Sequence, residues 1–172
     1  IKREVDSNFD AHQIPYTRVA YANGKYAFVS DYARFKILYE EGGIYLDTDV
    51  EVLTPLDSII AEGPFMGEEV VKRCNPGVGM GAEPQMPFLK EMIEFYHTLS
   101  FIKPDGSLNM QNIVNYTSEM LIKYGYKESS TIQHIAGFNI YPPEYFCPIN
   151  YFTKERIVTP NTFSIHHFAE SW

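Results

Sequence analysis

The chain has few cysteines, few basic residues and no long apolar run, and each shortage excludes a class of protein. Its two cysteines, Cys74 and Cys147, stand far apart, and no CxxC pair or Cys/His zinc spacing is present. We expect a reduced pair, with a disulfide as the alternative. No stretch stays apolar for the roughly 20 residues that a membrane-spanning helix needs, and no signal peptide is visible.

Positive charge is scarce. Lys and Arg total 14 against 22 Asp and Glu, which gives a formal net charge of -8. Such a surface repels the phosphates of nucleic acids and anionic lipids, so we expect no nucleic-acid partner. A local basic pocket for a small anion remains compatible with this balance.

Apolar and aromatic residues, in contrast, are abundant. Apolar residues make up 45% of the 172 residues, and they include 13 Tyr and 12 Phe. This length and composition predict one folded domain with a substantial core. We expect most aromatic rings to pack in that core, with stacking on carbohydrate as the alternative.

Apolar periodicity and turn residues predict alternating helices and short strands, which is the α/β class. Helices are predicted at 16–22, 25–41, 56–61, 87–100 and 109–124, strands at 44–47, 50–53 and 65–71, and short strands or loops at 140–143, 145–148 and 164–167. The glycines at 42 and 43 end the second helix. Residues 75–83, with glycine at alternate positions, predict a loop or a strand that approaches a ligand.

The most informative segment spans residues 30–51. A predicted helix stops at Gly42-Gly43 and leads into a strand that ends in Asp47-Thr48-Asp49. Carboxylates two residues apart on an extended backbone point to the same side. They can hold Mg²⁺ or Mn²⁺ with open positions, and such a cation can bind a diphosphate. The alternative interpretation is turn-forming acids after a strand.

Asp31 and Arg34 lie three residues apart and share one face of the predicted helix. On their own they would form a surface salt bridge contributing about 0–1 kcal/mol. Beside the two aspartates, however, the carboxylate can accept hydrogen bonds from sugar hydroxyls. The guanidinium can donate in a fixed fork to a sugar or a phosphate.

The segment Ser30-Asp31-Tyr32-Ala33-Arg34 … Gly42-Gly43-Ile44-Tyr45-Leu46-Asp47-Thr48-Asp49 resembles the sugar-binding signature of DxD-motif glycosyltransferases. The resemblance is to the family 32-like enzymes, which include bacterial capsular and lipopolysaccharide transferases and the yeast initiating mannosyltransferase. It implies a GT-A fold, a Rossmann-like mixed sheet flanked by helices. It also implies one catalytic domain over residues 1–172, incomplete at the N-terminus because the family's first strand lies upstream of Ile1.

The resemblance implies roles for individual residues. Asp49 would ligate the metal directly, and Asp47 would contact the metal or the ribose; with Asp31 and Arg34 they form the expected catalytic set. Asp31, Arg34, Tyr45 and Asp47 would bind the donor.

A second signature lies at the end of the chain, residues 165–172. It resembles the family's C-terminal element, which returns to the metal and the diphosphate. His166 is the expected third metal ligand, with His167 as the alternative. Ser171 and Trp172 would donate hydrogen bonds to phosphate oxygens.

The function implied is a metal-dependent, retaining hexosyltransferase (EC 2.4 class) that uses Mn²⁺ or Mg²⁺. It would move a sugar from a nucleotide diphosphate sugar, with a UDP-sugar favoured over a GDP-sugar, to a glycan acceptor. The expected setting is bacterial capsule or lipopolysaccharide biosynthesis in the cytoplasm, with peripheral association at the inner face of the membrane. Two alternatives stay open: a non-catalytic sugar-nucleotide or glycan-binding relative, and a metal-dependent phosphohydrolase, which needs more clustered His and Asp ligands.

Overall fold

The computed structural model of the protein describes residues 9–150, 153 and 155–168. These residues form a mixed α/β structure, as expected, with a five-stranded sheet flanked by helices and a separate two-stranded sheet. The helices are α1 (Pro15–Ala22), α2 (Tyr26–Glu41), α3 (Asp57–Ala61), α4 (Pro87–Thr98), α5 (Ile113–Ile122) and α6 (Pro143–Phe146). The strands are β1 (Gly43–Tyr45), β2 (Val50–Val52), β3 (Phe65–Val70), β4 (Arg73–Ala82), β5 (Gln133–Ile135), β6 (Phe138–Tyr141) and β7 (Ser164–His166).

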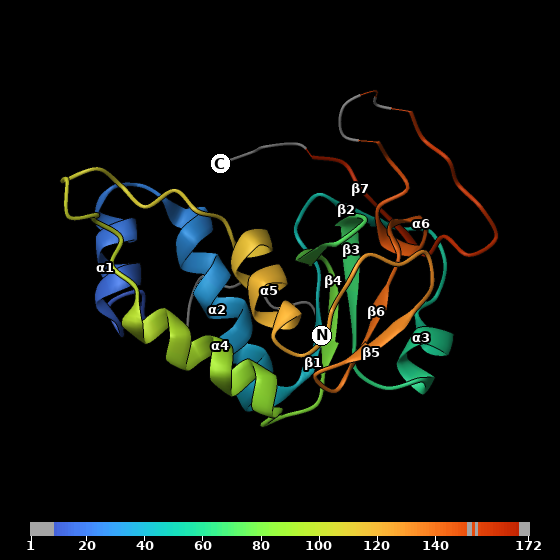
Figure 1. The fold of residues 1–172 in the computed structure, drawn as a ribbon, viewed down its shortest axis with the longest axis horizontal. Coiled ribbons are helices and arrows are strands. Elements are labelled where there is room, and N and C mark those ends of the chain that lie inside the picture. Colours follow the sequence, from blue (N-terminus) through green and yellow to red (C-terminus); the bar gives the residue numbers. More distant parts are fainter. Residues whose placement is uncertain (1–8, 151–152, 154, 169–172) are drawn as a thin grey trace.

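The large sheet has the strand order β1-β4-β3-β6-β5. Strands β3 and β6 run parallel, and the other neighbouring pairs run antiparallel. Strands β2 and β7 pair separately, with Val50 opposite His166. In Figure 1, α1, α2, α4 and α5 gather on one side of the sheet, and α3 and α6 lie on the other. The sheet therefore separates two layers of packing.

Aromatic rings fill much of the larger core, which extends from the sheet into the four-helix layer. Tyr16, Phe35, Tyr96 and Phe101 are all buried there. The ring of Tyr16 meets those of Tyr96 and Phe101 edge to face at 5.3 and 5.2 Å between centroids. Edge-to-face pairs of this kind are a favourable arrangement for aromatic side chains. These rings serve packing, as the composition predicted.

Helix α2 ends where the glycine pair predicted. Gly42 has φ +67°, and its N–H donates to the carbonyl of Leu38 at 2.9 Å. A Cβ at position 42 would also lie 2.7 Å from Cδ of Pro84. The stop therefore depends on both the backbone angle and the space that glycine leaves.

Three local predictions are corrected by the structure. Strand β1 ends at Tyr45, so Asp47 and Asp49 lie in the connection to β2, closed by a bond from the N–H of Val50 to the carbonyl of Asp47 at 3.1 Å. Helix α5 begins at Ile113 rather than at residue 109, because the side chain of Asn112 caps it by accepting from the N–H of Asn115.

The third correction concerns residues 145–148, predicted as a strand or loop. Residues 145 and 146 belong instead to α6, which starts with Pro143 in its first turn.

Cys74 and Cys147 are both buried and form no disulfide, which agrees with the expected reduced pair. Among the described residues, none of the helices has the length and apolar character needed to cross a bilayer.

Candidate functional site

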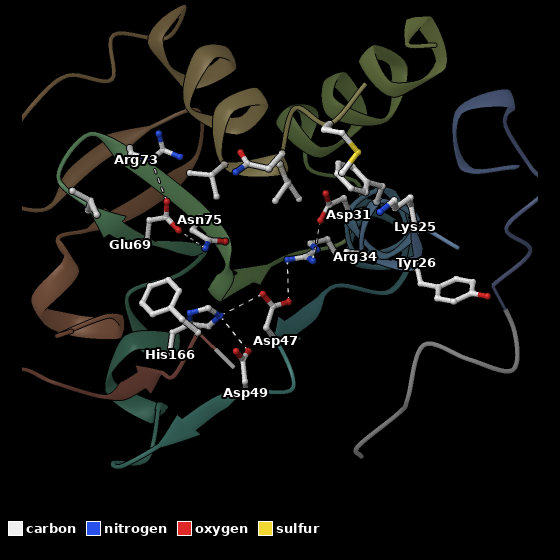
Figure 2. Close-up of a pocket in the computed structure, with 18 of the residues that line it drawn as sticks. Lys25, Tyr26, Asp31, Arg34, Asp47, Asp49, Glu69, Arg73, Asn75 and His166 are labelled. Atoms are coloured by element: carbon white, nitrogen blue, oxygen red, sulfur yellow. Dashed lines mark hydrogen bonds and ion pairs between the residues drawn. The ribbon is translucent and has the colours of Figure 1, made fainter. Parts of the chain in front are cut away.

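Asp47 and Asp49 meet His166 in the structure, although more than a hundred residues separate the aspartates from the histidine in the sequence. The two aspartates lie in the β1–β2 connection, and His166 ends β7, which pairs with β2. Nε2 of His166 lies 3.2 Å from Oδ1 of Asp49 and 3.8 Å from Oδ2 of Asp47. One ligand atom from each residue lies within 4.8 Å of the others, and Figure 2 shows the three side chains facing one another.

This group of atoms fits a divalent metal ion. Two carboxylates and one imidazole supply negative oxygen and neutral nitrogen ligands, and a set of three leaves positions for a substrate. His166 is buried, and its Nδ1 has no hydrogen-bond partner among the described residues. The ring is oriented instead by strand pairing and by an edge-to-face contact with Phe168 at 4.4 Å.

A buried guanidinium lies next to the group formed by Asp47, Asp49 and His166, the candidate metal-binding group. The Arg34 side chain is 4% exposed, and its Nη2 donates to Oδ1 of Asp31 at 3.1 Å. Its Nη1 lies 3.2 Å from Oδ1 of Asp47, an ion pair without hydrogen-bond alignment. Cζ of Arg34 also lies 4.4 Å from the centre of the Tyr45 ring. Arg34 therefore joins helix α2 to the aspartate connection.

The two acids that share Arg34 respond differently to their surroundings. Burial raises the pKa of Asp47, but the guanidinium of Arg34 and the contacts with His166 and Tyr45 outweigh it and lower that pKa to about 2. Burial dominates at Asp31 and raises its pKa to about 7, although Arg34 opposes the change. Asp47 is the firmly ionised member of the pair and the better ligand for a cation.

Gly77 of β4 supports Asp47, a role that the sequence did not indicate. Its carbonyl accepts from the N–H of Asp47 at 2.8 Å. A Cβ at this position would lie 2.0 Å from Oδ2 of Asp47 and 3.0 Å from Nη1 of Arg34. The alternating glycines at 75–83 did predict close approach of a strand, and here the approach is to the site's own side chains.

A pocket of about 710 Å³ opens over the site. Among the residues that line it are Asp31, Arg34, Asp47, Asp49 and His166. Further lining residues come from three other places: the start of α2 (residues 24–28), β3 and β4 (Glu69, Val70, Arg73, Asn75), and the start of α5 (Met110, Asn112, Ile113, Val114). Sequence reasoning missed Lys25, Glu69 and Arg73, for which no motif gave a signal. The volume is in the range of small-molecule sites.

The remaining predicted residues fall in different places. Tyr45 donates its hydroxyl hydrogen bond to Oδ1 of Asp47 at 3.0 Å and lies against Arg34, so it supports the site from behind. The backbone N–H of His167 donates to the carbonyl of Asp49 at 3.1 Å, but its side chain pairs with Glu51, with Nε2 2.9 Å from Oε2. Ser171 and Trp172 lie outside the described residues.

Comparison with known proteins gives a match to a family model. Neither a curated protein nor a solved structure matches the chain significantly. Residues 2–66 match a family model described as a glycosyltransferase sugar-binding region containing a DXD motif. That span contains the buried Asp31–Arg34 pair and both aspartates of the metal-binding group, so the match supports a DXD-type glycosyltransferase.

Proposed function

We propose that this protein is a metal-dependent, retaining glycosyltransferase that moves a sugar from a nucleotide diphosphate sugar to a hydroxyl group of a glycan acceptor. The observation that carries the proposal is the convergence of Asp47, Asp49 and His166 on one point of a substrate-sized pocket. The family match over residues 2–66 supports the same class of reaction.

Each residue of the site has a part in this reaction. Asp47, Asp49 and His166 would hold the cation, Mn²⁺ in our proposal with Mg²⁺ as the alternative. When bound, such an ion neutralises charge on the diphosphate. Arg34 fixes one oxygen of Asp47 and leaves the other turned toward His166. Asp31 lines the pocket and would accept hydrogen bonds from hydroxyls of the donor sugar.

The proposed chemistry retains the anomeric configuration. The bond between the anomeric carbon and the diphosphate oxygen breaks, and its electron pair leaves with the diphosphate. The acceptor hydroxyl forms the new bond on the same face, and its proton passes to the departing diphosphate. Isolation of a covalent glycosyl-enzyme would contradict this route and require a carboxylate nucleophile instead.

The finer assignments rest on resemblance to the family. We propose a UDP-sugar as the donor, with a GDP-sugar as the alternative, and we propose that Tyr45, Ser171 and Trp172 contribute to donor binding. We further propose that residues 1–172 form one catalytic domain. The setting would be synthesis of a bacterial surface polysaccharide at the cytoplasmic face of the membrane, with peripheral association.

The test is a calorimetric titration of the protein against UDP- and GDP-sugars, with Mn²⁺ and with EDTA. We expect one donor to bind when Mn²⁺ is present and not when EDTA is present. We expect the Asp49→Asn variant to lose this binding. The matched control is Asp105→Asn, which changes an exposed aspartate outside the pocket. Binding that survives both EDTA and Asp49→Asn would contradict a metal-held donor. Failure of every donor to bind would contradict the transferase itself.

A further inference from the structure

A polar cluster on one side of the pocket has no part in the proposed donor site. It consists of Glu69 near the end of β3 and of Arg73 and Asn75 at the start of β4. In Figure 2 these side chains lie together on one side of the pocket, Lys25 and Asp31 lie on the other, and Asp47 lies between. The cluster faces the same cavity as the metal-binding residues.

Hydrogen bonds hold the carboxylate of Glu69 in one orientation. Nε of Arg73 donates to its Oε1 at 3.1 Å, and Nδ2 of Asn75 donates to its Oε2 at 2.9 Å. Asn75 is itself fixed, because its Oδ1 accepts from the N–H of Gly77 at 2.7 Å. Gly77 in turn holds the backbone of Asp47 through its carbonyl. Glu69 is thus tied to the DxD connection through two residues of β4.

The cluster retains capacity to bind a ligand. Each carboxylate oxygen accepts more than one hydrogen bond, and each oxygen of Glu69 receives one from these partners. Toward the described residues, Arg73 donates a hydrogen bond through Nε only, and its side chain is 46% exposed. An acceptor of hydrogen bonds therefore lies beside free N–H donors, an arrangement that suits a hydroxyl group, which both donates and accepts.

Charge separates this cluster from the diphosphate end of the donor. The fixed negative charge of Glu69 repels a phosphate and compensates the positive charge of Arg73. The diphosphate belongs instead at the cation between Asp47, Asp49 and His166. What remains for the cluster is a neutral, hydroxyl-rich ligand that enters the same pocket.

We propose that Glu69, Arg73 and Asn75 bind hydroxyl groups of the acceptor sugar, with Glu69 as the principal hydrogen-bond acceptor. This inference rests on the proposed function. In the competing explanation, the Glu69–Arg73 ion pair only strengthens the β3–β4 hairpin. That explanation predicts a change in stability without a selective change in sugar binding.

The experiment compares the wild-type protein with Glu69→Gln, which keeps the shape of the side chain and removes its charge. The matched control is Glu94→Gln, because Glu94 also pairs with a basic residue four positions away, Lys90 at 3.7 Å, but on α4 outside the pocket. The probes are the methyl glycosides of glucose, galactose and mannose. Their binding is measured by saturation-transfer NMR with the diamagnetic ion Mg²⁺ and either UDP or GDP.

We expect the wild-type protein to bind at least one glycoside and Glu69→Gln to bind it about tenfold more weakly, since a charge-assisted hydrogen bond is lost. Glu94→Gln should match the wild type, and the nucleotide affinity of Glu69→Gln should stay unchanged. Absence of glycoside binding, equal binding by Glu69→Gln, or a parallel loss of nucleotide affinity would overturn the acceptor assignment. The proposed function fails separately, if the wild-type protein shows no metal-dependent donor binding.

Discussion

Arg34 is the residue on which the geometry of the site depends most. Its buried guanidinium lies between the carboxylates of Asp31 and Asp47, which would otherwise face each other's charge in a region of low dielectric. Replacement of a buried charged residue leaves its partners without a counter-ion. Removal of one member of an exposed ion pair, in contrast, costs little stability. The same residue therefore affects both stability and the orientation of the Asp47 carboxylate.

We predict that Arg34→Met lowers the free energy of unfolding by about 3–5 kcal/mol, because the buried Asp31 and the partly buried Asp47 lose their counter-ion. The control is Lys36→Met, which removes a cation from the more exposed Lys36–Glu40 pair on the same helix and should cost about 1 kcal/mol or less. Urea denaturation of both variants measures the difference. Equal losses would show that Arg34 is solvated like a surface residue.

Gly77 allows a second prediction at the scale of one atom. Gly77→Ala places a Cβ where Oδ2 of Asp47 now lies, so Asp47 must move. Gly79→Ala, on the same strand, instead meets the ring of Phe146 at 3.0 Å. Both should lose about 1–3 kcal/mol of stability through overpacking.

Only Gly77→Ala should also weaken Mn²⁺ binding, by about tenfold or more if one carboxylate ligand is displaced. Calorimetric titration with Mn²⁺ and thermal denaturation of the two variants separate these effects. A wild-type Mn²⁺ affinity of the Gly77→Ala variant would show that Asp47 is not a metal ligand.

Asp31 gives the stability of the protein a dependence on pH. Its pKa in the folded state is raised to about 7 from an ordinary 3.8, mainly by burial. The folded state therefore holds this proton more tightly than the unfolded state does. Its contribution to stability is complete below about pH 4 and is lost as the pH rises toward about 7.

We expect the Asp31→Asn variant to show a flatter pH profile of unfolding free energy in this window, since Asn has no proton to release. Urea denaturation of both proteins between about pH 4 and pH 8 provides the comparison. A wild-type profile no steeper than that of the variant would mean that Arg34 keeps Asp31 ionised throughout.

At the scale of elements, the start of α5 shows how a cap positions the pocket wall. Asn112 caps the helix and lines the pocket, and α5 packs against β4. We predict that Asn112→Ala lowers stability by about 1 kcal/mol, because the N–H of Asn115 loses its partner. Asn112→Asp retains an accepting oxygen and should stay near the wild type. Chemical denaturation of the two variants tests this, and equal losses would assign the effect to packing instead.

The sequence predicted the elements whose signals are local. Helix α2 was expected over residues 25–41 and occupies Tyr26–Glu41, because periodic apolar residues and a terminal glycine both act within a few residues. The start of α5 was misplaced, since the Asn112 cap overrides an apolar pattern that continues upstream. The chain after Tyr45 was predicted as a strand, but it turns at Asp47 to reach β2.

The non-local part of the site had weaker signals. The aspartates were predicted from their spacing and from family resemblance, and His166 from the resemblance alone. Their meeting depends on the pairing of β2 with β7, which no local pattern specifies. Glu69 and Arg73 carried no motif at all. They line the pocket next to a place where the pairing of β3 with β4 is irregular, between Glu68 and Val70.

At the scale of the whole molecule, negative charge prevails both overall and in the pocket. The chain has a formal net charge of -8. The pocket is lined by Asp31, Asp47, Asp49 and Glu69 against Lys25, Arg34 and Arg73. With Asp31 ionised, the acids of the pocket outnumber its bases by one, which disfavours a diphosphate that enters without a cation. This charge balance is in keeping with the metal dependence that we propose.

The most direct test of the central claim is a crystal structure of the protein grown with Mn²⁺ and UDP, with anomalous diffraction recorded at the manganese absorption edge. We predict one strong anomalous peak bounded by Asp47, Asp49 and His166, with the diphosphate in contact with it. A peak elsewhere, or UDP bound in the pocket without manganese, would contradict a DxD-held cation as the basis of donor binding.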